Sequence, residues 1–158
     1  MSQLLAQILA SAIGGGGLPV TPGASGTILT SNGTDAVWTT PAPSVAWVPT
    51  FTASGGTFTS VTSDIRSMRF GSIVVLTGKY TIVNAGTATG ATLMTLPYAA
   101  ARPSVGAAAE VATTGDSCRV RVDPAVLGAS SSSILRYNNT AVITTGYVVE
   151  FGLTYEAA

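Results

Sequence analysis

Residues 147–155 read YVVEFGLTY, and this stretch decides the fold class. Every second residue is large and apolar, whereas the residues between them include Glu150, Gly152 and Thr154. Successive side chains of a β-strand point to opposite faces, so this spacing predicts a strand with one buried face. The residues predicted to form that face are Tyr147, Val149, Phe151, Leu153 and Tyr155.

The same alternation extends outward over residues 45–158, with turn-forming residues about every 8–12 positions. This pattern predicts an all-β domain, an antiparallel β-sandwich of the jelly-roll kind. Strands are expected at 56–62, 65–70, 72–83, 91–96, 117–122, 133–137, 141–144 and 147–155. No helix is expected after residue 14, apart from a turn near residues 99–102.

Residues 1–23 form a separate N-terminal segment. Residues 2–13 have apolar side chains at helical spacing between Ser2, a suitable N-cap, and Gly14, a natural stop. The predicted helix is too short to be stable alone, so its apolar stripe is expected to dock on a partner. The docking residues are Leu4, Leu5, Ile8, Leu9 and Ile13.

A Gly-rich arm over residues 14–23 completes the N-terminal segment. A signal peptide is the alternative interpretation, because residues 10–12 read ASA, a small-x-small pattern. No Lys or Arg precedes that apolar stretch, which favours the docking helix over the signal peptide.

Residues 24–44 form a second small part. Ile28-Leu29 and Val37-Trp38 flank an Asn-Gly turn at residues 31–34, the pattern of a β-hairpin. A Pro-containing linker follows over residues 39–44. The chain is therefore expected to divide into residues 1–23, 24–44 and 45–158.

The composition excludes several classes of function. Only 9% of the 158 residues are charged, the formal net charge is zero, and there is no histidine. A neutral chain lacks the basic surface of a nucleic-acid binder, and a chain without histidine lacks the usual acyl-transfer triads. The single cysteine, Cys118, can form no internal disulfide. No run of 18 apolar residues is present, so no membrane-spanning helix is predicted. We expect no enzyme, no cofactor and no metal centre.

Candidate contact residues are few. Arg119, Arg121 and Asp123 alternate with apolar residues, so they are expected on one strand face, as a polar groove or an intersubunit ion-pair network. An ordinary solvent-facing strand is the alternative. Asn138 and Asn139 are expected at an exposed tip that could supply hydrogen bonds, with a plain surface loop as the alternative. Tyr137, at the end of the strand expected at 133–137, could stack on a sugar, with burial in the core or an interface as the alternative. Cys118 is expected on the buried face.

Two stretches of the chain carry short motifs in a recognisable order. Residues 26–38 read GTILTSNGTDAVW, and residues 47–156 contain WVPT at 47–50, GTFTSV at 56–61, RSMRFG at 66–71, RYNN at 136–139 and TYE at 154–156. The first resembles a unit, G-x-x-L-T-S-N-G-x-x-x-x-W, found in bacteriophage tail fibres and appendages. The second resembles the β-sandwich domain at the C-termini of many phage tail fibres and head fibres.

The resemblance implies a structural virion protein that forms a homotrimer and has no catalytic residues. It implies a short fibre or spike, held to capsid, collar or tail by its N-terminal arm and displaying the β-domain to a host-surface glycan or protein. Two alternatives stay open, a head decoration or cement spike and a free carbohydrate-binding module. Nothing in the sequence indicates nucleic-acid binding or membrane insertion.

Overall fold

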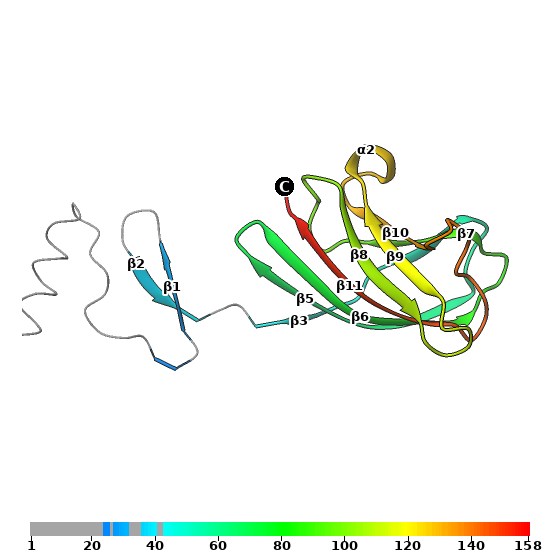
Figure 1. Cartoon of the computed structure of the whole chain (residues 1–158), viewed down its shortest axis with the longest axis horizontal. Coiled ribbons are helices and arrows are strands. Elements are labelled where there is room, and N and C mark those ends of the chain that lie inside the picture. Colours follow the sequence, from blue (N-terminus) through cyan, green and yellow to red (C-terminus); the bar gives the residue numbers. More distant parts are fainter. Residues whose placement is uncertain (1–23, 26, 32–35, 41–42) are drawn as a thin grey trace, which may run out of the picture. The chain divides into compact units, whose positions relative to one another are not determined.

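The computed structural model describes residues 24–25, 27–31, 36–40 and 43–158. The chain divides into two compact units, residues 1–42 and 43–158, which we describe separately (Figure 1). The predicted docking helix, with Leu4, Leu5, Ile8, Leu9 and Ile13, and the Gly-rich arm lie outside the described residues.

In the first unit, strands β1 (Ile28–Ser31) and β2 (Ala36–Thr39) form an antiparallel pair. The register runs from Ile28↔Thr39 to Ser31↔Ala36. This pairing confirms the hairpin predicted from the Asn-Gly signal, although the turn itself lies outside the described residues.

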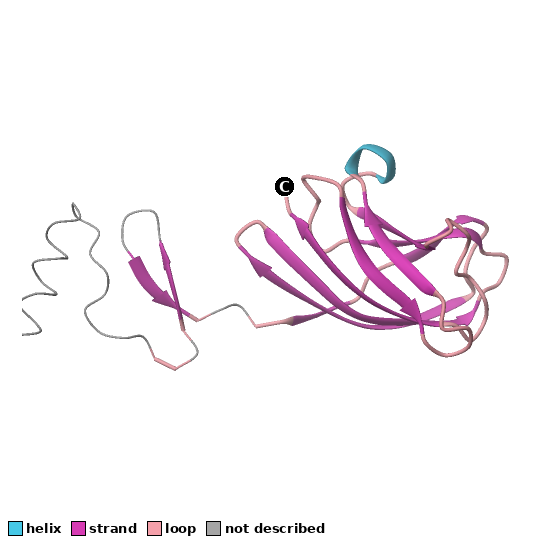
Figure 2. Ribbon diagram, in the orientation of Figure 1, coloured by secondary structure: helices cyan, strands magenta, loops and turns pink. Residues whose placement is uncertain are grey.

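In the second unit, nine strands form one antiparallel sheet with the order β3-β5-β6-β11-β8-β9-β10-β7-β4. Figure 2 shows these strands in magenta. The sheet is continuous, and the predicted division into the two sheets of a sandwich is not confirmed. The strands are β3 (Val45–Trp47), β4 (Phe51–Gly55), β5 (Ser60–Phe70), β6 (Ile73–Asn84), β7 (Thr89–Thr95), β8 (Ser104–Glu110), β9 (Ser117–Val122), β10 (Ser131–Arg136) and β11 (Val148–Glu156).

The sheet curls so that its inner side encloses a common core (Figure 1). The two edge strands, β3 and β4, are joined by residues 48–50 only, which keeps one end of each edge close to the other. Phe51 of β4 packs against Tyr80 of β6 across the interior, with ring centroids 4.8 Å apart. The curl therefore brings strands far apart in the sheet order into contact.

The alternation in residues 147–155 corresponds to the burial found in the structure. Val149, Phe151, Leu153 and Tyr155 are all buried, whereas Glu150, Gly152 and Thr154 are exposed. Cys118 is buried on the inner face of β9, as predicted, with Val120 and Val122. Each of the larger side chains contributes about 1.5–3 kcal/mol through removal of apolar surface from water.

The side chains of Tyr80 and Tyr155 are buried in the core of the β-domain. The Tyr155 hydroxyl donates to the carbonyl of Tyr98 at 2.9 Å and accepts from its N–H at 3.3 Å. Burial raises the pKa of Tyr155 to about 12, because ionisation inside the core is unfavourable. Burial likewise raises the pKa of Tyr80, which faces the Thr92 side chain.

Residues 141–144 do not form the predicted strand. The Ala141 carbonyl accepts a hydrogen bond from the Arg136 guanidinium, and the Thr140 carbonyl accepts from the Arg136 N–H at 3.0 Å. The two carbonyl groups therefore bond to Arg136 and not to a neighbouring strand, and the prediction of a strand at 141–144 was wrong.

The strands expected at 56–62 and 65–70 form one strand, β5, which begins at Ser60. Four elements were not predicted from the sequence: the edge strands β3 and β4, the strand β8 and the helix α2. β8 has the sequence SVGAAAE, whose small residues carry little β-propensity. The helix α2 (Pro124–Leu127) is one turn long, capped by the Asp123 carboxylate, with Pro124 in its first turn. No helix among the described residues is long and apolar enough to cross a membrane.

Gly106 marks the place where β8 leaves its pairing with β11. The pairing of β8 with β11 ends at Ala107↔Gly152, and Gly106 continues in register with Val120 of β9. A Cβ atom on Gly106 would overlap the Gly152 carbonyl oxygen and lie 2.9 Å from the Leu153 Cα atom. A side chain at this crossing is therefore sterically excluded.

We predict that Gly106→Ala lowers the free energy of unfolding by about 1–3 kcal/mol, the usual effect of overpacking. Gly152→Ala is the matched control, because a Cβ atom there meets nothing within 4 Å in the chain. Its effect should stay within about 0.5 kcal/mol of wild type. Urea unfolding followed by far-UV circular dichroism measures the free energy of unfolding of both variants. Equal stability of the two variants would contradict the steric exclusion of a side chain at Gly106.

Candidate functional site

Two of the candidate residues, Arg119 and Arg121, lie on β9, and the third, Asp123, follows the end of that strand. Arg119 and Arg121 both point to the outer face of the sheet, the face turned away from the core. Arg121 forms an ion pair with Asp123, whose other carboxylate oxygen accepts from the Ala125 N–H at 3.2 Å. Because Asp123 caps α2 and its side chain is only 10% exposed, it offers little surface to a ligand.

Arg119 belongs instead with the turn after β10. The Arg119 guanidinium donates to the Asn139 side-chain oxygen, which links the outer face of β9 to residues 137–139. The Tyr137 N–H donates to the Ser117 carbonyl at 3.3 Å, so the turn lies at the start of β9. Asp123 lies beyond the other end of that strand, next to α2.

The turn itself is held by its own side chains. Asn139 adopts a φ of 65°, a left-handed conformation that asparagine tolerates better than most residues. The Asn138 side-chain oxygen accepts from the Thr140 N–H at 3.0 Å and from the Thr140 hydroxyl at 2.6 Å. Tyr137 is 58% exposed. Arg119, Tyr137 and Asn139 therefore form one polar and aromatic surface, which we call the turn surface.

Arg136 lies in the RYNN motif but was not predicted as a contact residue, and its side chain makes the polar contacts at the end of β10. Its Nε atom donates to the Asp116 carboxylate at 2.7 Å, and its Nη2 atom donates to the Tyr147 hydroxyl at 3.2 Å. Hydrogen bonds from Thr114 and Arg136 hold the pKa of Asp116 below its ordinary value. Asp116 and Arg136 are 20 residues apart, so only the β9–β10 register could have predicted their pairing.

Glu110 is a fully buried carboxylate at the end of β8. Its oxygens accept from the N–H groups of Ala112 at 2.9 Å, Thr113 at 3.0 Å and Thr114 at 2.6 Å. The Val148 N–H also donates at 3.3 Å. Burial alone would raise the pKa of Glu110, but the backbone donors outweigh it and lower the pKa to about 2. Glu110 therefore stays ionised and fastens its loop to β11.

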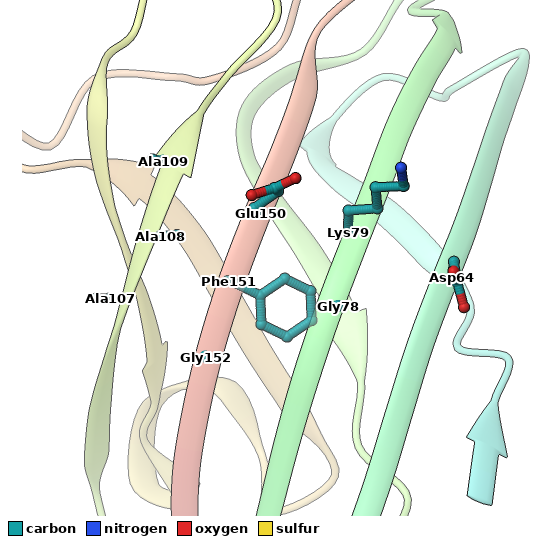
Figure 3. A pocket seen from close by; sticks show the side chains of 9 residues that line it. All are labelled: Asp64, Gly78, Lys79, Ala107, Ala108, Ala109, Glu150, Phe151 and Gly152. Atoms are coloured by element: carbon teal, nitrogen blue, oxygen red, sulfur yellow. The ribbon is translucent and has the colours of Figure 1, made fainter.

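A shallow depression lies on the outer face of β5, β6, β11 and β8, with a volume of about 580 Å³ (Figure 3). Asp64, Lys79 and Glu150 form one cross-strand row on it, because Asp64 pairs with Lys79 and Lys79 with Glu150. Ala107 and Gly152 lie in the next row and leave the floor low. The sequence reading missed this row, since its members come from three strands.

The described residues contain no group of three His, Cys, Asp or Glu side chains that could hold a metal ion. Cys118 is free and buried, and burial raises the pKa of its thiol, which disfavours the reactive thiolate. Its Sγ atom lies 3.4 Å from the Asp116 carbonyl oxygen.

Comparison of the chain with protein-family models, with curated proteins and with solved structures found no match in any of the three.

We predict that Glu110 makes part of the stability depend on pH. Its folded-state pKa of about 2 lies below the ordinary value of 4.5, so the contribution is present above pH 4.5 and is lost as the pH falls toward 2. In Glu110→Gln this part of the acid dependence should disappear, and stability at pH 7 should fall by about 1–3 kcal/mol.

Urea unfolding at pH 7, 4 and 3 measures the effect. Asp64→Asn is the control, because the exposed Asp64 carboxylate forms no ion pair with the described part of the chain. That variant should keep the loss of stability that Glu110 causes at low pH, because it leaves the hydrogen bonds to the Glu110 carboxylate in place. An identical pH profile for Glu110→Gln and wild type would contradict the role assigned to the buried carboxylate.

Proposed function

We propose that the chain is a structural protein of a bacteriophage particle, a short trimeric fibre or spike that displays its β-domain for attachment to a host surface. The observation that carries the proposal is the ordered set of fibre-like motifs over residues 26–38 and 47–156. Two features of the fold support it. The first motif contains a paired hairpin, and the second corresponds to an antiparallel β-domain.

The division of the chain supports separate anchoring and display roles. Residues 43–158 form a compact unit of their own, with a continuous core. Residues 1–23 have the apolar stripe and Gly-rich arm expected of a segment that docks on capsid, collar or tail. The display unit can then project from the particle while the short helix holds it.

A non-enzymatic role is supported by the use of the carboxylates near β8 and β9. Glu110 holds a loop, Asp116 pairs with Arg136, and Asp123 caps α2. A general acid must carry a proton near the working pH, whereas Glu110 has a pKa of about 2. These carboxylates serve the fold, and the turn surface is free to contact a glycan or protein.

A sandwich-like arrangement and a trimer belong to the same proposal. The curled sheet packs its two ends over one core, as the layers of a sandwich do, and Phe51 and Tyr80 meet between them. Only 9% of the residues in the chain are charged. Charged residues on a surface oppose association between copies, so a chain with few of them associates more readily. Three copies around an axis would bury part of that surface.

A head decoration or cement spike is the second candidate, favoured by the short stretch between the predicted anchor and the β-domain. A decoration spike would occur in many copies over the shell, and its loss would lower capsid stability while adsorption stayed intact. A fibre would occur in few copies at a tail or vertex. A free carbohydrate-binding module is a third candidate, which would bind glycan without any particle.

We predict that Leu5→Asp combined with Leu9→Asp abolishes incorporation into particles, because the charges would fall on the apolar stripe of the predicted helix. Gln3→Asp combined with Gln7→Asp is the matched control on the polar positions and should leave incorporation unchanged. Immunoblotting of purified particles measures both. Normal incorporation of the Leu5 and Leu9 variant would overturn the anchoring role.

Tyr137→Ala is predicted to slow adsorption to host cells at least tenfold while particles assemble normally, because an exposed aromatic at a binding surface contributes about 2 kcal/mol or more. Val126→Ala, at another exposed site, is the control and should adsorb like wild type. Adsorption rate constants measured with purified particles give the comparison. Unchanged adsorption with a loss of capsid stability on deletion would favour the decoration spike.

A further inference from the structure

Large apolar side chains of β5, β6 and β8 lie exposed on the outer face of the sheet. Phe70 is 43% exposed, Ile73 42% and Val105 64%. Phe70 and Ile73 are register partners at the β5–β6 turn, and Val75 follows Ile73 on the same side of β6. Exposed apolar side chains gathered on one face mark an interaction surface.

The first four residues of β6 are apolar on both sides of the strand. Its inner side buries Val74, Leu76, Tyr80 and Ile82, and its outer side presents Ile73, Val75 and Val83 among threonines. An antiparallel strand with one solvated face alternates between apolar and polar residues, whereas a strand covered on both faces reads as a continuous apolar run. The sequence IVVL at residues 73–76 belongs to the second kind.

The same face carries a row of charges of alternating sign, Asp64, Lys79 and Glu150. No ion pair of 4 Å or less joins any of them to another described residue, although each is a direct cross-strand neighbour of the next. Figure 3 shows the Lys79 side chain extending away from the Glu150 carboxylate. Lys79 on the β6 side and Glu150 on the β11 side are therefore available to pair with opposite charges of another molecule.

The extent of the face suits a protein partner. Four strands of about nine residues cover a planar area on the order of 600 Å², from the usual strand rise and spacing. A standard interface buries about 800 Å² of accessible surface on each partner, and side-chain relief increases the accessible area above the planar value. The low floor at Ala107 and Gly152 lets a neighbouring side chain approach closely.

We propose that this outer face is the interface between copies of the chain, with Lys79 of one copy paired to Glu150 of the next around a three-fold axis. The apolar part of the interface comes from Phe70, Ile73, Val75 and Val105. The inference rests on the trimer of the proposed function and assigns the surface that forms it. A second copy fits better than a glycan, because it supplies both apolar side chains for Ile73 and Val105 and opposite charges for the row.

The first experiment compares two exposed valines in the purified full chain. Val105→Asp places a charge on the outer face, whereas Val126→Asp places the same charge on α2, where Val126 is 70% exposed. Sedimentation equilibrium should give three times the chain mass for wild type and Val126→Asp. Val105→Asp should sediment as a single chain, and its far-UV circular dichroism spectrum should match that of the wild type.

The second experiment is a charge exchange, which keeps the test decisive if Val105→Asp does not fold. Lys79→Glu and Glu150→Lys should each weaken association tenfold or more, as truncation of a buried charge pair does. The two changes combined in one chain should restore association, because each pair is then re-formed with reversed sign. If the double variant associates no more strongly than either single variant, the assigned ion pair between Lys79 and Glu150 is overturned.

The remaining outcomes separate this inference from the proposed function. A wild-type trimer that persists in Val105→Asp would overturn the assigned face and leave the fibre proposal intact. A wild-type single chain at high concentration would overturn the interface, and particle incorporation would still test the fibre role independently. If the wild type is a single chain and particles that carry the Val105→Asp variant adsorb poorly to host cells, the outer face binds a host ligand. That result would overturn the inference.

Discussion

The antiparallel pairing of β11 with β6 is the constraint on which the rest of the domain depends. It runs without a break from Val148↔Thr81 to Glu156↔Ile73 and joins segments about 70 residues apart in sequence. β5 then extends the sheet on one side and β8 on the other. A shift of one residue in this register would move the buried face of β11 to the solvent, so the core and the register specify each other.

The few charged side chains of the chain lie in separate parts of the β-domain and have different roles. Glu110 and the Asp116–Arg136 pair hold the loops around the start of β9 and the end of β10, and Asp123 holds α2. Glu110 and the Asp116–Arg136 pair stabilise the end of the domain that presents the turn surface, whereas Asp123 lies beyond the other end of β9. The unpaired row on the outer face has no such role within one chain. The same chain thus separates charges that maintain the fold from charges available for association.

Much of the β-domain could be predicted from local pattern, and the failures have local causes. β11, β9 and most of β6 alternate clearly, because one face of each is packed with large side chains. β8 was not predicted because its small residues lack the alternation of large apolar side chains that indicates a strand. Small residues are needed there, since β8 comes very close to the backbone of β11 at Gly106. Residues 141–144 read AVIT and contain three β-branched residues, which favour strands. They form no strand, and the Ala141 carbonyl accepts a hydrogen bond from the Arg136 side chain instead of from a neighbouring strand.

The sequence by itself determined the antiparallel β class, the hairpin at residues 28–39 and the inward direction of residues such as Cys118, because these follow from side-chain period and turn chemistry over a few residues. Only the tertiary structure decided that the strands form one curled sheet and that Asp64, Lys79 and Glu150 form a row. The physical reason is that strand order and register are set by contacts between distant segments. Periodicity within a single strand carries no information about its neighbours.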